Sequence, residues 1–163
     1  MSVFIVVESA FGNTATVAEA VAEGLRDSNR DRLVTVAPSG EASDLPSDCD
    51  LLIVAAPTHN MGLPSKTTRA EAVKRGATGY TGPGVREWIE RQEPSPELRA
   101  IAIDTANKSF FARFGTARKA ARTHLIKRGM RKAEAGPSFW VEGTVGPLHE
   151  GETVRAREWG ASL

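Results

Sequence analysis

Residues 3–14 read VFIVVESAFGNT, and this stretch decides the fold of the chain. Its first five residues are apolar and mostly β-branched, which predicts a buried strand. A short polar turn follows, and after it Val17, Val21 and Leu25 recur at helical spacing. A strand that passes through a tight turn into a helix points backbone N–H groups and the positive end of the helix dipole at one place. Such a place suits a phosphate.

The turn at residues 9–14 also carries suitable side chains. Ser9, Asn13 and Thr14 supply donors, and Gly12 allows a ligand to approach the backbone closely. The same residue types are common caps of an ordinary helix, so on the turn alone that alternative stays open. The turn lacks Gly-x-x-x-x-Gly-Lys and Gly-x-Gly-x-x-Gly, and therefore is neither of those two nucleotide-binding loops.

The pattern Ser-x-x-Gly-Asn-Thr in this turn resembles the first strand–helix loop of the flavodoxin family. In that family the loop wraps the phosphate of FMN. The resemblance therefore implies FMN as the cofactor, with its phosphate held by six successive residues: Ser9, Ala10, Phe11, Gly12, Asn13 and Thr14.

Strand and helix signals alternate along the rest of the chain. After the strand at 3–7, further strands are predicted at 33–36, 50–56, 98–104 and 138–141. Helices are predicted after the first turn and at 83–92, 116–128 and 150–159, and residues 68–75 have helical composition. This alternation predicts a doubly wound α/β fold, with a five-stranded parallel sheet and helices on both faces. The flavodoxin resemblance implies the strand order 2-1-3-4-5, and the length suits one domain over residues 1–163.

In such a sheet the ligand lies beyond the carboxyl ends of the strands, so the loops after strands 1, 3 and 4 are expected to converge. The loop at 57–62 is similar to the flavodoxin loop that borders the flavin ring. The loop at 104–107 takes the place of the family's second ring-bordering loop, although it lacks the usual Gly-x-Gly-Asp pattern. The resemblance thus implies ring contacts from Pro57, Thr58, His59, Asn60, Met61 and Gly62 on one side, and from Asp104, Thr105, Ala106 and Asn107 on the other.

Flavodoxins usually stack aromatic side chains on the flavin ring. Here the candidates are His59 and Met61 in one loop, and Phe110 or Phe111 shortly after the other. For the two phenylalanines a place in the core is the alternative interpretation.

Two further stretches, Thr68–Ala72 and Phe139–Leu148, resemble an actinobacterial-type branch of flavodoxin-domain proteins. The resemblance assigns them no role. The first stretch lies in the long segment between Pro57 and Pro83, and segments of this size are usually functional or have structure of their own. Three interpretations of this segment stay open: a lid over the ring, a partner surface, or an insertion without function.

Charge is unevenly distributed along the chain. The formal net charge is +1, yet nine Lys or Arg and no Asp or Glu lie between Thr105 and Ala133. The ordinary interpretation of this 108–132 stretch is a solvated helix face, and the functional alternative is a docking site for an anionic partner. Nucleic acid is not expected, because the pI is about 7.9 and aromatic residues are sparse.

The sequence predicts a cytoplasmic protein without a membrane partner. It contains no apolar run near the ~20 residues of a membrane span, and no signal-peptide pattern precedes the first strand. Its one cysteine, Cys49, excludes an internal disulfide and is interpreted as a packing residue. Its three histidines lack metal-ligand spacing, so no metal is expected.

The leading functional hypothesis is an FMN-binding electron-transfer protein that exchanges electrons with redox partner proteins or with a small-molecule acceptor. One alternative is an NAD(P)H-dependent flavin or quinone oxidoreductase, in which the long 57–83 segment closes over the hydride donor. Another is a flavodoxin-fold binding module with weak or no FMN affinity. No catalytic side chain is assigned, because a bound flavin would supply the chemistry.

Overall fold

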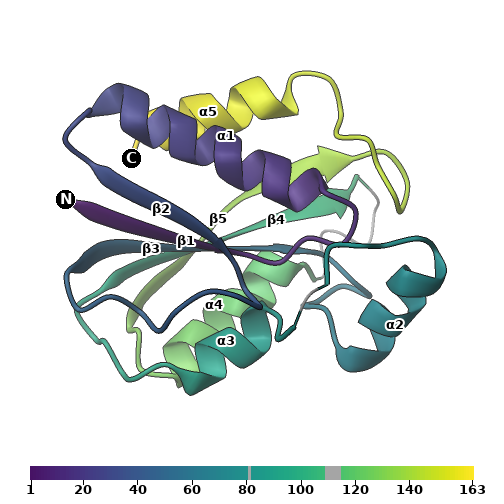
Figure 1. Cartoon of the computed structure of the whole chain (residues 1–163), viewed down its shortest axis with the longest axis horizontal. Coiled ribbons are helices and arrows are strands. Elements are labelled where there is room, and N and C mark those ends of the chain that lie inside the picture. Colours follow the sequence, from purple (N-terminus) through teal and green to yellow (C-terminus); the bar gives the residue numbers. More distant parts are fainter. Residues whose placement is uncertain (81, 109–114) are drawn as a thin grey trace.

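The computed structural model describes residues 1–80, 82–108 and 115–163. Its centre is a parallel sheet of five strands in the order β2-β1-β3-β4-β5 (Figure 1). The strands are β1 (Ser2–Val7), β2 (Leu33–Pro38), β3 (Cys49–Pro57), β4 (Arg99–Asn107) and β5 (Lys132–Val141). The doubly wound α/β fold and the strand order predicted from the sequence are therefore confirmed.

Helices cover both faces of this sheet. On one face lie α1 (Asn13–Ser28) and α5 (Glu152–Ala161), and on the other lie α3 (Val85–Arg91) and α4 (Ala117–Lys127) (Figure 1). The alternation of side chains along β1 explains the two layers, because Val3 and Ile5 join the core under α1, whereas Phe4 and Val6 join the core under α3 and α4. A strand buried on both faces accounts for the unbroken apolar run at the start of the sequence.

The prediction for the last strand was wrong at its start, since β5 begins six residues earlier, at Lys132 rather than Ser138. β5 is an edge strand, and its first half is rich in exposed residues such as Lys132 and Glu134. An edge strand also tolerates Pro137, because a proline there need not donate to the sheet. These residues lack the apolar pattern by which the other strands were predicted.

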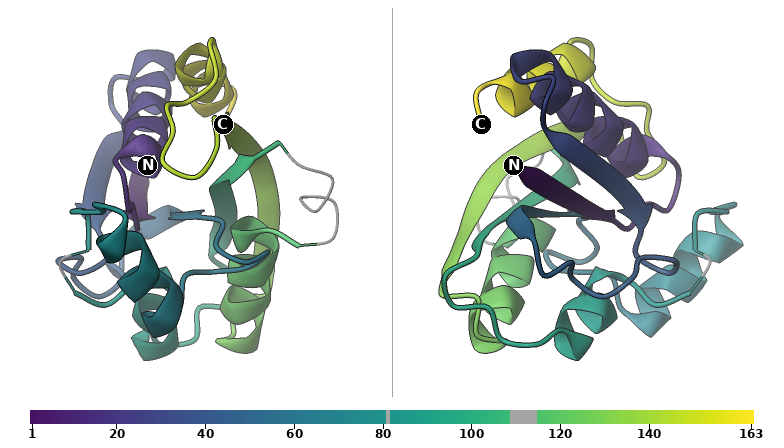
Figure 2. Two further views of the ribbon diagram at one scale, coloured as in Figure 1. Left: turned by 90° about the vertical axis from the view of Figure 1, so that its right-hand side faces the viewer. Right: turned by 60° about the vertical axis from the view of Figure 1, so that its left-hand side comes forward.

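A fifth helix, α2 (Lys66–Lys74), lies outside both helical layers. It stands at the edge of the sheet where the parallel strands end (Figure 1). The left view of Figure 2 looks onto this edge, with α2 on one side of the strand ends and the stretch 142–151 on the other. Both segments therefore flank the place where a doubly wound fold binds its ligand.

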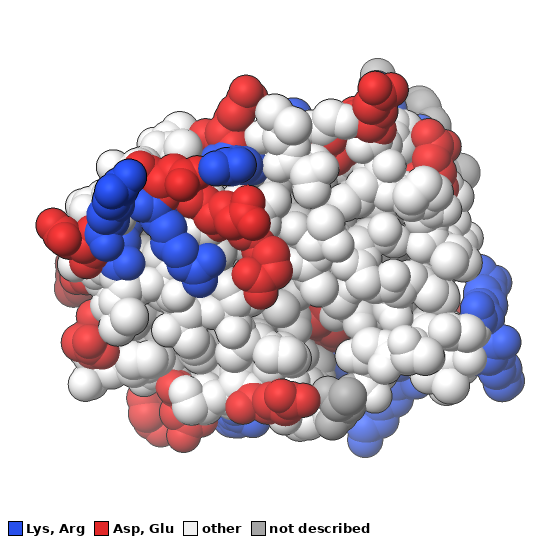
Figure 3. All heavy atoms as spheres, turned by 45° about the horizontal axis from the view of Figure 1, so that its top comes forward, with Lys and Arg blue, Asp and Glu red and all other residues white. Residues whose placement is uncertain are grey.

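Charged groups are mixed on the face that carries α1 and α5. Figure 3 shows acidic and basic side chains side by side toward one end of this face, and much of the rest of the view is uncharged. One of the ion pairs joins the two helices, between Arg157 of α5 and Asp27 of α1. In the described part of the chain no helix is both long and apolar enough to cross a membrane.

The basic stretch at 108–132 lies mostly on α4 and at the start of β5. Arg118 and Arg122 donate hydrogen bonds to backbone carbonyls of β5, and Lys132 pairs with Glu97. Arg118 and Arg122 thus serve the fold and Lys132 has a partner at the surface, so less of the stretch is left for an anionic partner. Arg113 lies outside the described residues.

Candidate functional site

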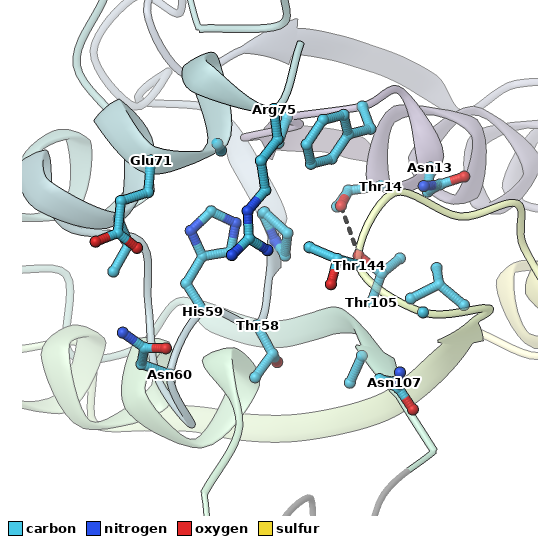
Figure 4. A pocket seen from close by; sticks show the side chains of 18 residues that line it. Asn13, Thr14, Thr58, His59, Asn60, Glu71, Arg75, Thr105, Asn107 and Thr144 are labelled. Carbon is cyan, nitrogen blue, oxygen red and sulfur yellow. Dashed lines mark hydrogen bonds between the residues drawn. The ribbon is translucent and has the colours of Figure 1, made fainter. Parts of the chain in front are cut away.

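A pocket of about 270 Å³ opens at the carboxyl edge of the sheet. Figure 4 shows that its walls come from segments far apart in the sequence. Thr14 lies at the start of α1, Thr58 directly after β3, Thr105 near the end of β4, and Arg75 at the C-terminal cap of α2. Its volume is near the lower end of ligand pockets, about 300–1,000 Å³. The loops after β1 and β3 meet at this pocket, as predicted, whereas the third contribution comes from the end of strand β4 and not from the loop after it.

Most of the residues predicted for the site line this pocket. From the loop after β1 these are Ala10, Phe11, Asn13 and Thr14, from the loop after β3 Pro57, Thr58, His59 and Asn60, and from the end of β4 Thr105, Ala106 and Asn107. Five predicted residues do not line it: Ser9, Gly12, Met61, Gly62 and Asp104. Phe110 and Phe111, the candidate stacking residues, lie outside the described part of the chain.

The 9–14 loop leaves the N-terminus of α1 open toward the pocket. Gly12 precedes the helix with φ 91°, a left-handed conformation that a glycine adopts without strain. The hydroxyl oxygen of Ser9 accepts hydrogen bonds from the N–H groups of Gly12 and Ala15, each at 3.2 Å. Within the described residues, no acceptor serves the N–H groups of Asn13 and Thr14. The Ser9 hydroxyl therefore stabilises the conformation of the loop. Two N–H groups of the first helical turn remain available to an anion.

The side chains of Asn13 and Thr14 have different partners. Thr14 and Thr105 share a buried hydrogen bond of 2.7 Å between their hydroxyls, which ties the 9–14 loop to the end of β4 (Figure 4). Asn13 donates from its amide to the carbonyl of Val145 at 2.8 Å. Asn13 thus fastens the stretch after β5 to the 9–14 loop. Its side chain was predicted as a phosphate donor, but in this structure it is already bonded within the protein.

A tight turn shapes the second loop. His59 and Gly62 exchange two backbone hydrogen bonds of 2.9 Å, and the two residues between them, Asn60 and Met61, have φ of 45° and 60°. Asn tolerates such angles, whereas for an unbranched apolar residue like Met61 they are uncommon and strained. Met61 is 52% exposed and does not line the pocket. The turn presents His59 and Asn60 to the pocket instead.

His59 is held as a neutral side chain beside the pocket. Its imidazole lies 3.4 Å from the hydroxyl of Tyr80, and the two rings meet edge to face. Burial lowers the pKa of His59 below its ordinary value, and the positive charge of Arg69 lowers it further. Burial likewise raises the pKa of the Tyr80 phenol, so both groups are uncharged near pH 7 and offer hydrogen bonds rather than charge.

Asp104 serves the fold instead of the pocket. Its carboxylate accepts a hydrogen bond of 2.9 Å from the N–H of Arg118 and one of 3.3 Å from the hydroxyl of Thr58. The Thr58 hydroxyl in turn accepts from the N–H of Ala117 at 2.9 Å. Asp104 of β4 and Thr58, directly after β3, therefore cap the N-terminus of α4. The loop after β4 begins later than predicted, because the strand continues through Asn107 and Asp104 lies buried within it.

One wall of the pocket was not predicted, and α2 forms it. Thr68, Glu71 and Ala72 of this helix and Arg75 at its C-terminal cap line the pocket. On the opposite side Val141, Gly143 and Thr144 line it from the stretch that follows β5. These residues lie in or next to the stretches 68–72 and 139–148. Both stretches resemble flavodoxin-domain proteins in sequence, but the resemblance assigned no role to them. The likeness itself was the signal that could have placed them at the site.

A buried ion network fixes α2 to the sheet. Arg69 of α2 donates to the carboxylate of Glu8 at 2.6 Å and to that of Glu87 at 2.9 and 3.0 Å. Glu8 directly precedes the 9–14 loop, and it also accepts the N–H of Val85 at the start of α3, at 2.9 Å. One guanidinium thereby joins β1, α2 and α3. The side chain of Glu8 is only 2% exposed, so this network is largely shielded from water.

The chain after α2 also packs on the 9–14 loop. Ala72 and Ala77 bury against Ala10, and the N–H of Gly79 donates to the carbonyl of Ala10 at 3.2 Å. A Cβ on Gly79 would lie 1.9 Å from the carbonyl oxygen of Ser9, so only glycine permits this approach. These contacts favour a fixed wall over a mobile lid.

No protein-family model and no curated protein matches the sequence. Solved structures do match the fold. A flavodoxin from the domain Archaea matches with a TM-score of 0.62 and 15% identity, over 99% of this chain and 95% of that one. Oxidised flavodoxin 1 from Bacillus cereus matches with a TM-score of 0.65 and 16% identity, over the same shares. The flavodiiron protein from Giardia intestinalis matches with a TM-score of 0.57 and 17% identity, and this chain covers 35% of it. Together with the strand order, these likenesses show that the chain has the flavodoxin-like fold.

Proposed function

We propose that this protein binds FMN in the pocket at the carboxyl edge of its sheet and serves in electron transfer. The phosphate belongs in the 9–14 loop, and the flavin ring belongs between the 57–60 loop and the end of β4. Three observations support the proposal: the motif in the first loop, the flavodoxin-like fold, and the position of the pocket at the carboxyl edge of the sheet. Such a protein would be expected in the cytoplasm.

The observation that carries the proposal is the open N-terminus of α1 at the pocket. The N–H groups of Asn13 and Thr14 have no acceptor in the described part of the chain, and α1 has no side-chain cap at Gly12. A 16-residue helix directs its dipole at this point, which favours an anion. The hydroxyl of Ser9 accepts two N–H groups and still has its own proton to donate. The residues present therefore fit a phosphate.

The rest of the pocket fits an uncharged, hydrogen-bonding ring. Neutral His59, Asn60 and Asn107 offer donors and acceptors, while Pro57 and Ala106 supply apolar surface. A bound flavin would supply the redox chemistry, in steps of one or two electrons. The protein's part is to orient the ring, to limit water around it, and to set the charge near it.

A second candidate function, an oxidoreductase that acts on a small molecule, is favoured by the α2 wall. This helix adds a wall along one side of the pocket, and the wall is anchored through Arg69 and Gly79. A protein that exchanges electrons with another protein gains from an exposed ring edge, whereas an enclosed pocket suits a small molecule.

The test is to mix the purified protein with excess FMN, remove free flavin by gel filtration, and record the absorption spectrum. Bound flavin in a stoichiometric ratio supports the proposal, and a colourless protein overturns it in favour of a binding module without FMN. If FMN binds, oxidation of NAD(P)H by the loaded protein alone would favour the oxidoreductase over the electron carrier.

A further inference from the structure

Arg75 is the one positively charged side chain among the described residues that line the pocket. The other ionised lining residue is Glu71, and His59 is neutral near pH 7. In the described part of the chain no carboxylate or carbonyl accepts a hydrogen bond from the Arg75 guanidinium. Figure 4 shows this side chain extending from α2 into the pocket, on the side of His59. An arginine placed in this way is ready to pair with an anion.

We propose that Arg75 forms an anion subsite for a second small molecule, one that carries a carboxylate, sulfonate or phosphate and exchanges electrons with the bound flavin. This inference rests on the proposed function and names the chemical class of its substrate. The subsite is distinct from the 9–14 loop.

The position of Arg75 favours a second molecule over the phosphate of the cofactor. In Figure 4 Arg75 reaches toward His59 and Thr58, whereas Thr14 and Thr105 lie across the pocket. The open N–H groups that suit a phosphate belong to Asn13 and Thr14. Arg75 therefore faces the part of the pocket assigned to the ring, where a second reactant would lie.

The wall that presents Arg75 is rigidly held. The Arg69 network joins α2 to β1 and α3, and Ser65 and Thr68 form a capping box at the first turn of α2. A fixed backbone reduces the entropy lost when the arginine engages a ligand.

Helix stability does not distinguish Arg75 from its neighbour Lys74, whereas the pocket does. A cation in the last turn of a helix interacts favourably with its dipole, but Lys74 already supplies that interaction at the neighbouring position. Of the two side chains, Arg75 lines the pocket and Lys74 does not. This difference makes Lys74 a matched control, equal in charge and adjacent in sequence.

The test measures binding to the oxidised, FMN-loaded protein, which cannot reduce a quinone. 1,4-Naphthoquinone-2-sulfonate and neutral 1,4-naphthoquinone are titrated separately, and binding is followed by the change in the flavin spectrum. We expect Arg75→Gln to weaken the sulfonate about tenfold and to leave the neutral quinone nearly unchanged. Lys74→Gln should alter neither, and Glu71→Gln should strengthen the sulfonate by removing a like charge.

Three results would overturn the inference alone while FMN still binds. In the first, Arg75→Gln and Lys74→Gln weaken the sulfonate equally, which would indicate general attraction by α2. In the second, the unmodified protein shows no preference for the sulfonate. In the third, Arg75→Gln removes the preference for FMN over riboflavin, which would place Arg75 on the cofactor phosphate. Failure to bind FMN at all would overturn the proposed function, and this inference with it.

Discussion

Replacing Arg69 with Met should destabilise the protein severely, because it leaves a buried carboxylate without its cation. Arg69 is 11% exposed and Glu8 is 2% exposed, and their closest atoms are 2.6 Å apart. Removal of one partner from a buried pair costs about 3–5 kcal/mol. Glu87 is 32% exposed and can return to water, so most of this loss comes from Glu8. A loss of this size is a large part of the ~5–15 kcal/mol that stabilises a typical domain.

Urea unfolding of the apo-protein, followed by circular dichroism, measures this loss. With a slope of about 2 kcal/mol per molar urea, the midpoint should fall by about 1.5–2.5 M. The matched control is Arg99→Met, which breaks an ion pair with Glu134 whose two side chains are 49% and 53% exposed. An exposed pair contributes about 0–1 kcal/mol, so the control should unfold nearly as the unmodified protein does.

A second variant separates the buried charge from the lost packing. Glu8→Gln combined with Arg69→Met keeps an acceptor for the N–H of Val85 but removes the unpaired charge. The double variant should therefore be more stable than Arg69→Met alone. The reasoning fails if Arg69→Met costs less than about 1 kcal/mol, or if the double variant recovers nothing.

Three further predictions concern residues in or next to the pocket. Met61→Gly should stabilise the protein by up to about 1 kcal/mol, because glycine adopts the left-handed backbone conformation of this position without strain. Thermal unfolding measures the change, and a lowered midpoint would count against strain at Met61. Thr14→Val should cost about 1–3 kcal/mol by leaving the buried hydroxyl of Thr105 without a partner, and replacing both threonines with Val should recover much of it. The pKa of His59, followed by NMR, should lie below about 6.5 and should rise in Arg69→Met. Because the folded pKa is the lower one, His59 should reduce stability as the pH falls below about 6.5.

The centre of the sheet could be predicted because β1, β3 and β4 are buried on both faces. β1 and β3 read as nearly unbroken apolar runs, and no helix pattern competes with them. The first half of β5 could not be predicted in this way. This half lies at the edge of the sheet, so many of its side chains are exposed to solvent. It therefore lacks the apolar run that marks a buried strand.

The predicted site residues that line the pocket belong mostly to short continuous segments, in which neighbours in sequence are also neighbours in space. The 9–14 loop and the 57–60 loop each follow a buried strand, and a parallel sheet brings their ends together. The role of Asp104 could not be read in the same way. The sequence does not show that β4 continues to Asn107, and this continuation turns the carboxylate of Asp104 toward the start of α4.

The place of α2 beside the pocket stayed one of three open interpretations, because only the tertiary structure brings this helix to the pocket. Arg69 reaches Glu8 across 61 residues of sequence, and Asn13 reaches Val145 across 132. No local sequence pattern reveals contacts over such separations. In addition, a polar helix that buries one arginine has the same sequence pattern as a fully exposed helix. The geometry shows that α2, fixed through Arg69 and Gly79, forms an anchored wall of the pocket.

The central claim is that the 9–14 loop holds the phosphate of FMN, and a comparison of FMN with riboflavin tests it most directly. The two ligands differ only in the phosphate, and fluorescence quenching by the apo-protein gives both affinities. Two charge-assisted hydrogen bonds of roughly 1.5–3 kcal/mol each predict that FMN binds at least ~100-fold more tightly. Equal affinities would contradict the account, because they would show that the open N-terminus of α1 does not bind the phosphate.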